Sequence, residues 1–377
     1  MTTASSSTPG WSKVQIPRPL QRLFDLFPLR AYEPNDLPER SQHLTFSSLP
    51  TLFIFTTDED ARLGLPSFNP TCLRWQTLLR LTGLEFRVLP STNHASPTGA
   101  LPFLLPARSS STGSSSSSSG ALPPSTSPSQ PPPPSSSPSP PTPIPASKLL
   151  AYAQSHANPA KSSHPATSGD RLFPSRARAY VALVSNHLRS AWLCALYLDP
   201  ARAGLLDALY LRPASSSAAV RAALRRQLRK AAGEQILDSA PAAGALRSRP
   251  GERERERERA EQGKGAPSWD WAWQEDGTAI DPRAVYASAR EAMAALASLL
   301  AESKTEWFFD AEAPSEFDAA VFSYTHLMMQ YMSDGEEEAG ALGKMVQSAG
   351  DGELARHREK LWRFAWPEGN GEAKEGR

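Results

Sequence analysis

The chain of 377 residues contains only two cysteines, Cys72 and Cys194, and it has no long apolar run. Two cysteines cannot build a disulfide framework or a cysteine-rich zinc site, so a reducing compartment is expected. The best apolar run, Ala191 to Leu198, stops at Asp199 and is far shorter than the ~18 residues of a membrane span. Any contact with a membrane should therefore be peripheral, with no transmembrane span.

An excess of charge of one sign is also absent, because 40 basic residues balance 39 acidic ones and the net charge is +1. This balance, together with the lack of a nucleic-acid-binding motif, argues against a nucleic-acid partner. The seven histidines show no metal-ligand spacing, and no glycine-rich phosphate loop or Ser–His–Asp set is recognisable. We therefore expect no metal and no cofactor, and we expect His326 to be a core side chain.

Proline is abundant, with 36 residues, but the excess is local. Residues 107–143 hold 16 serines and 11 prolines and no aromatic residue, which cannot bury enough apolar surface to offset chain entropy. We expect a disordered insertion there, although its proline runs could also bind a module that reads polyproline helices. Disordered loops are likewise expected at 240–267, where Glu and Arg alternate, and at the acidic 333–352, and a disordered tail at 367–377.

The N-terminus is Ser/Thr-rich and its first 24 residues carry no acid, a composition that also occurs in transit peptides. Pro9, Pro17 and Pro19 would break the amphipathic helix that such a peptide needs. We therefore expect a disordered arm at 1–18, followed by a lead-in segment at 19–48.

The remaining segments predict an α/β part followed by an all-α part. Short apolar runs predict strands at 51–57, 85–89 and 101–105. A helix should begin at Pro70 with Asn69 as its N-cap, and another should cover 146–157. From residue 172 onward only helices are expected, at 175–198, 218–237, 283–302, 315–332 and 353–364. The predicted domains are thus 49–158 and 171–366.

This order resembles the glutathione-transferase-like fold, in which a thioredoxin-like domain precedes a helical domain. The stretch Gly99 to Leu104 looks like the segment that carries a cis-proline in that fold, so a cis bond is expected before Pro102. Ser315 and Asp318 have the spacing of a capping box, similar to the one that opens the core helix of glutathione-transferase helical domains.

Two stretches resemble the metaxin branch of this fold more closely: Gly64–Leu73 (GLPSFNPTCL) and Asn93–Phe103 (NHASPTGALPF). Metaxin-like proteins are peripheral subunits of the sorting and assembly machinery (SAM complex) of the mitochondrial outer membrane. The resemblance implies a receptor subunit on the cytosolic face that binds β-barrel precursors through a terminal β-signal. It also implies two partners, a membrane β-barrel subunit and a second metaxin-like subunit.

An enzyme of glutathione-transferase type, or a thiol-dependent one, is the alternative, with Ser67 or Cys72 as its reactive group. Cys72 falls near the start of a helix, where N–H dipoles can lower the pKa of a thiol. The family's carboxylate for the γ-glutamyl amine is replaced here by Ala146, beside Ser147 and Lys148. That loss counts against glutathione binding, and we expect no catalysis. A scaffold module of the same fold, without a mitochondrial address, is a third reading.

Partner-binding residues are harder to identify. Asn93 and His94 lie in a polar loop with no evident core role, and an extended precursor segment could add to exposed strand edges. Trp269, Trp271 and Trp273 alternate with other residues and form either a partner anchor or a docked loop, since tryptophan is enriched in binding hot spots.

Overall fold

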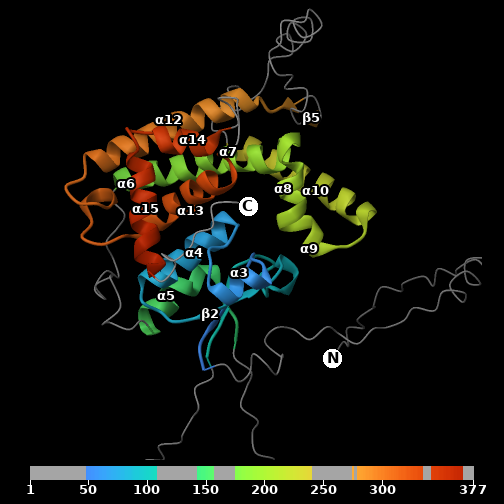
Figure 1. The fold of residues 1–377 in the computed structure, drawn as a ribbon, viewed down its shortest axis with the longest axis horizontal. Coiled ribbons are helices and arrows are strands. Elements are labelled where there is room, and N and C mark those ends of the chain that lie inside the picture. The colour runs from blue at the N-terminus through green and yellow to red at the C-terminus, as the bar shows by residue number, and fades with distance from the viewer. Residues whose placement is uncertain are drawn as a thin grey trace, which may run out of the picture.

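The computed structural model describes residues 48–107, 142–156, 175–239, 274–275, 278–333 and 341–367. A small sheet with its own helices lies beneath a larger helical domain (Figure 1). Trp269, Trp271 and Trp273, the arm at 1–18, almost all of the lead-in at 19–48, and the segment 240–267 fall outside the described residues. In the described part, no helix combines the length and the apolar character needed to cross a bilayer.

The sheet contains four short strands in the order β2-β1-β3-β4. Strand β1 (Thr51–Ile54) pairs in parallel with β2 (Arg87–Pro90) and antiparallel with β3 (Phe103–Leu105). All residues of β1 and β3 are buried, on both faces of the sheet, which explains why their sequences are apolar almost without interruption. The last strand, β4 (Ile144–Pro145), pairs antiparallel with β3 and was not predicted, because two residues cannot show a strand periodicity.

The helix predicted to begin at Pro70 is present. Helix α4 (Pro70–Leu81) has proline at its first position, and the Asn69 side chain accepts a hydrogen bond from the Cys72 backbone N–H at 3.2 Å. A short helix α3 (Asp58–Leu63) precedes it and was missed. Its signal was Thr57, whose hydroxyl accepts from the Asp60 N–H at 3.1 Å and donates to the Asp60 carboxylate at 2.7 Å.

The segment between β2 and β3 contains the cis bond predicted between Leu101 and Pro102, and the structure confirms it. A turn of 3₁₀ helix, η2 (Asn93–Ala95), lies before it. Gly99 has a φ of 72°, a left-handed conformation that favours glycine. Helix α5 (Ala146–His156) completes the domain.

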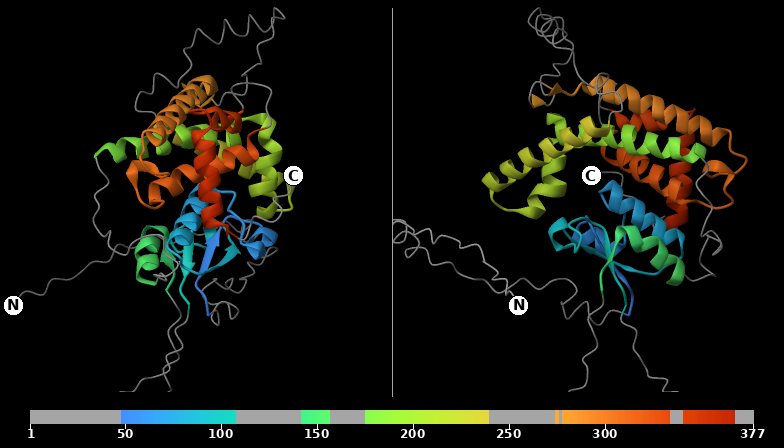
Figure 2. Two further views of the ribbon diagram at one scale, coloured as in Figure 1. Left: turned by 60° about the vertical axis from the view of Figure 1, so that its left-hand side comes forward. Right: turned by 180° about the vertical axis from the view of Figure 1, so that it is seen from behind.

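The helical domain begins with a nearly continuous helix from Ser175 to Leu198, as predicted. It is built from α6 (Ser175–Ala182), η3 (Leu183–Leu188), α7 (Arg189–Leu193) and η4 (Cys194–Leu198), and η3 and η4 are wider π turns. The chain then forms a projecting helical hairpin that was predicted only in its second arm (Figure 2). Its elements are η5 (Pro200–Arg202), α8 (Ala203–Leu206), η6 (Asp207–Leu211), α9 (Arg212–Ala214) and α10 (Ala218–Ser239).

The rest of the domain packs three long helices around one core. Two-residue strands β5 (Gln274–Glu275) and β6 (Thr278–Ala279) precede α12 (Pro282–Ala301), and η7 (Phe308–Asp310) leads into α13 (Glu316–Tyr331). The expectation of a disordered loop across 333–352 was wrong in its second half. Helix α14 (Leu342–Ser348) forms there and buries apolar side chains against α13, and α15 (Glu353–Ala365) follows.

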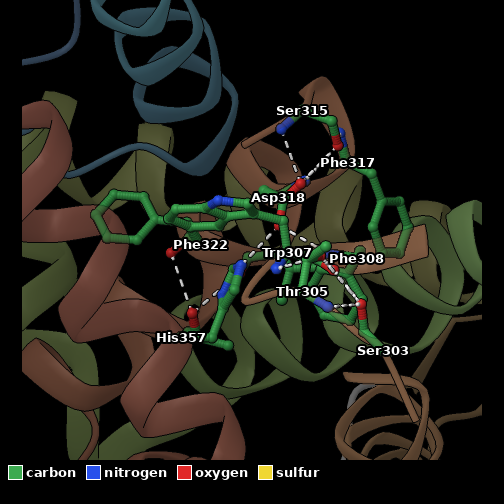
Figure 3. A network of polar contacts seen from close by, with 11 residues as sticks. Ser303, Thr305, Trp307, Phe308, Ser315, Phe317, Asp318, Phe322 and His357 are labelled. Atoms are coloured by element: carbon green, nitrogen blue, oxygen red, sulfur yellow. Dashed lines mark hydrogen bonds and ion pairs between the residues drawn. The ribbon is translucent and has the colours of Figure 1, made fainter. Parts of the chain in front are cut away.

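Asp318 is the centre of a buried polar network (Figure 3). One carboxylate oxygen accepts from the Ser315 N–H at 2.8 Å and from its hydroxyl at 2.6 Å, so the predicted capping box is confirmed. The other oxygen accepts from the Phe308 N–H at 3.2 Å and lies 2.9 Å from Nε2 of buried His357. Because a carboxylate only accepts, Nε2 carries the hydrogen. The network joins the start of α13 to η7 and to α15.

Replacing Asp318 should destabilise the protein strongly. Asp318→Asn removes acceptors from several buried donors, and we expect a loss of about 3–5 kcal/mol in the free energy of unfolding. Ser315→Ala removes only the cap and should cost about 1 kcal/mol. Urea unfolding followed by circular dichroism measures both. Glu353→Gln is the control, since its pair with Arg356 is exposed and should change stability by less than about 0.5 kcal/mol. Equal small losses for all three variants would contradict the central role of Asp318.

His326 is a buried core side chain, as expected. Its ring stacks on Trp362 with centroids 5.1 Å apart, and Nδ1 accepts from the Arg358 Nε–H at 3.2 Å. Burial, reinforced by the positive charge of Arg358, lowers the pKa of His326 from 6.5 to about 3. The imidazole is therefore neutral in the folded protein.

This pKa predicts an acid-sensitive contribution to stability. Between about pH 3 and pH 6.5 the unfolded chain protonates His326 and the folded one does not, so stability falls as the pH is lowered through this window. His326→Gln keeps an acceptor for Arg358 and removes the titration. We expect its free energy of unfolding to depend less on pH than that of the wild type, by up to about 1.4 kcal/mol per pH unit. Parallel curves for the two proteins between pH 4 and pH 6.5, from urea unfolding, would refute this assignment.

Candidate functional site: the junction of the two domains

The first candidate site is the corner where β1 ends and α4 begins, which contains Ser67 and Cys72. The Ser67 hydroxyl is fully buried and donates to the Phe55 carbonyl at 2.5 Å. It also accepts from the Asn69 N–H at 3.2 Å, and the Ser67 N–H donates to Gln76 at 2.9 Å. All of these contacts are internal, so this hydroxyl holds the loop in shape and has no free face toward a substrate.

The Cys72 thiol is equally enclosed. Its side chain is fully buried, and burial raises its pKa to about 12, against smaller lowering effects from hydrogen bonds to Phe55 and Ser67. Desolvation therefore outweighs the helix N-terminus, the effect that the sequence suggested could activate it. Cys72 packs with the sheet core and behaves as a small apolar residue.

Tyr210, from the projecting hairpin, covers this corner. Its hydroxyl accepts from the Asn69 side-chain amide at 3.1 Å, and its ring lies edge-on against Phe55 and Phe68, with centroids 5.4 and 5.1 Å away. Tyr197 adds a fourth ring, 6.1 Å from Tyr210. Burial raises the pKa of Tyr210 well above its usual value. Aromatic side chains thus fill the space above the start of α4.

The Gly64 turn has a structural role that connects the domains. Its carbonyl accepts from Arg80 at 2.8 Å and from the indole N–H of Trp366 at 3.0 Å, and the Arg80 guanidinium lies 4.9 Å from that ring. Gly64 has a φ of 65°, and a Cβ there would lie 3.1 Å from the Arg80 side chain. The sequence of the stretch at 64–73 is therefore explained by turn, cap and interdomain contacts.

The loop at 93–99 divides into a structural and a free part. Asn93 Oδ1 accepts from the Leu101 N–H at 3.0 Å, immediately before the cis-proline. The Asn93 side chain therefore has a structural role in that turn, which the sequence did not reveal. His94 is exposed and its side chain makes no hydrogen bond with the described residues, so this side chain has no structural role among them.

Both edges of the sheet are poor acceptors of an added strand. On β2, the N–H groups of Arg87 and Ser91 point toward β1 and donate to the carbonyls of Pro50 and Ile54. The backbone of the residues between them therefore points toward the free edge of the sheet. One of these residues is Pro90, which has no N–H to offer to an added strand. The other edge, β4, consists of Ile144 and Pro145. Prolines at edges limit pairing, and the expected strand addition is therefore disfavoured.

An open cleft of about 570 Å³ lies where α4, α6, η3 and α13 meet. Its lining begins at Pro70, next to the corner that Tyr210 covers, but contains neither Asn69 nor Tyr210. The residues that line it include Thr71, Arg74, Arg178, Val181, Val184, Arg189, Glu316, Phe317, Ala320 and Tyr324. Sequence reasoning missed this cleft, because its lining comes from three segments that are far apart in the chain.

Comparison with protein families agrees with this architecture. The model of the glutathione S-transferase N-terminal domain matches residues 70–123, and that of the glutathione S-transferase C-terminal domain matches residues 289–359. The chain therefore has a glutathione-transferase-like fold, with an N-terminal thioredoxin-like domain and a C-terminal helical domain. A search of the curated proteins finds no match.

The buried thiols should be unreactive in the folded protein. A shift of the Cys72 pKa from 9.0 to about 12 leaves about a thousandfold less thiolate at neutral pH, and Cys194 is also buried with a pKa of about 12. We expect a disulfide reagent such as DTNB to label neither thiol in native protein, and to label both in urea. Fast labelling of one thiol that disappears in Cys72→Ala, with Cys194→Ala as the matched control, would show that Cys72 is accessible.

Proposed function

We propose that the chain is a non-catalytic peripheral subunit of the sorting and assembly machinery of the mitochondrial outer membrane, on its cytosolic face. In this role it binds β-barrel precursors through their terminal β-signal and aids their insertion. Its partners are a membrane β-barrel subunit and a second metaxin-like subunit. The single observation that carries the proposal is the occupied corner at the start of α4, where Tyr210 lies over Asn69 and Cys72 is fully buried.

The chemistry of that corner supports binding over catalysis. A glutathione transferase needs an available hydroxyl or thiol there, and it needs a carboxylate at the start of the helix that follows the last strand. In this chain the hydroxyl of Ser67 is committed to Phe55, and Ala146, the first residue of α5, carries no carboxylate. Lys148 is exposed nearby and would repel an ammonium group.

The two metaxin-like stretches support the choice of complex. Both stretches contribute to the core of the sheet domain, where Cys72 of the first and Leu101 and Phe103 of the second belong to one cluster of buried side chains. Since the sheet edges are limited by Pro90 and Pro145, precursor binding would use side chains of surface loops more than main-chain pairing. His94 is the exposed residue of these stretches that we select for a contact test.

The first test is purification of a tagged chain from gently solubilised mitochondria, with the co-purifying proteins identified by mass spectrometry. We expect a membrane β-barrel subunit and a second metaxin-like chain. Recovery of the chain alone, or its absence from the mitochondrial fraction, would refute the proposal. Retention of the purified chain on immobilised glutathione, reduced by Ser67→Ala, would favour the enzyme instead.

A second test separates contact from structure in the 93–99 loop. A photoreactive amino acid in place of His94 should crosslink to a peptide that carries the β-signal, and His94→Ala should weaken the complex without changing stability. Asn93→Ala is the comparison, because it removes the hydrogen bond to Leu101 and should cost about 1 kcal/mol of stability. An unchanged complex and no crosslink would exclude this loop as the contact.

A further inference from the structure

We propose that the cleft between α4, α6 and α13 binds a small amphiphilic carboxylate, that is, one anionic group on an aliphatic body. The inference rests on the cleft alone and does not depend on the proposed function. The cleft volume of about 570 Å³ is within the range of ~300–1,000 Å³ that is usual for small-molecule sites.

The charges that line the cleft favour an anion. Three arginines face one carboxylate, and the Arg74 guanidinium forms an ion pair with Glu316 across the domain boundary. Among the described residues, the Arg189 side chain bonds only to a neutral group, the amide oxygen of Gln235, at 2.5 Å. Arg178 has no ion-pair or hydrogen-bond partner within the described ranges. Two positive charges therefore remain without a counter-charge in this part of the chain, and a ligand with one carboxylate would complement them.

The remaining lining provides an apolar surface and a neutral donor. Val184 and Phe317 are buried, and Val181 is 41% exposed at the open side of the cleft. Burial raises the pKa of Tyr324 to about 12, although Arg189 and Arg74 act in the opposite direction. Its phenol therefore keeps its proton at neutral pH and is able to donate to an oxygen of the ligand.

The position of the cleft distinguishes it from the place where this fold binds glutathione. That place adjoins Asn69, Ser67 and the cis-proline turn, and here Tyr210 fills the space above it. The cleft uses Arg74 and Thr71 from the exposed side of α4 instead. The aromatic rings that fill the corner do not line the cleft, which is a second, open interdomain site.

The test titrates decanoate into the purified full chain by isothermal calorimetry, with decanamide as the neutral analogue. We expect one decanoate to bind per chain, and decanamide to bind at least about tenfold more weakly, because a hydrogen bond to a charged group is worth about that factor. Arg178→Gln should weaken decanoate binding about tenfold, and Val181→Asp should abolish it by placing an acid at the apolar rim.

The controls lie on α10, outside the cleft lining. Val220→Asp matches Val181→Asp, since Val220 is 45% exposed, and Arg226→Gln matches Arg178→Gln. Both should bind decanoate like the wild type. Equal binding of decanoate and decanamide, or no effect of Arg178→Gln, would overturn the proposal. Binding of a peptide with a free C-terminal carboxylate, when decanoate does not bind, would also overturn it.

Discussion

The carboxylate of Asp318 accepts hydrogen bonds from three segments, and the position of α13 depends on it. Ser315 closes the first turn of α13, the Phe308 N–H fixes η7, and His357 ties α15 to the same point. Helix α13 in turn packs against α4, so the two domains meet along an element whose start is held by one buried charge. A buried carboxylate is costly without donors, and here its donors come from separate parts of the chain. The domains can therefore pack in this way only when the Asp318 carboxylate also has its hydrogen-bond donors.

The junction that results from this packing separates two environments on opposite sides of α4. On one side, aromatic rings and the Asn69–Tyr210 hydrogen bond close the corner where this fold elsewhere carries out chemistry. On the other side, arginines and exposed apolar groups line an open cleft. Filling this corner with side chains makes it rigid, because the Ser67 hydroxyl and the Cys72 thiol both become part of the packed interior. This division is the basis of our proposal that the chain binds partners without catalysis.

Local signals in the sequence were sufficient for the elements that local chemistry controls. The Asn69–Pro70 start of α4, the cis bond before Pro102 and the Ser315–Asp318 box each depend on neighbouring residues, and each is present. Helix α14 was missed, because the acidic residues before it dominate the composition of that segment while its apolar face is short. Neither Tyr210 above the corner nor the cleft could be predicted, since both arise from residues brought together only by tertiary packing. The stretch at 64–73 contains the Gly64 turn and the Asn69 cap, and both can be recognised from the sequence.

The pairing of β3 with β4 has a consequence for the length of the chain between them. These strands run antiparallel, so the backbone leaves the sheet after Leu105 close to where it returns at Ile144. A segment whose two ends are already adjacent can grow or shrink with little penalty, since each doubling of a flexible loop costs only about 0.6 kcal/mol of closure entropy. The Ser/Pro-rich stretch is thus located where variation in its length is nearly neutral for folding. The same point on the surface is the place where a reporter domain could be inserted without disturbing the sheet.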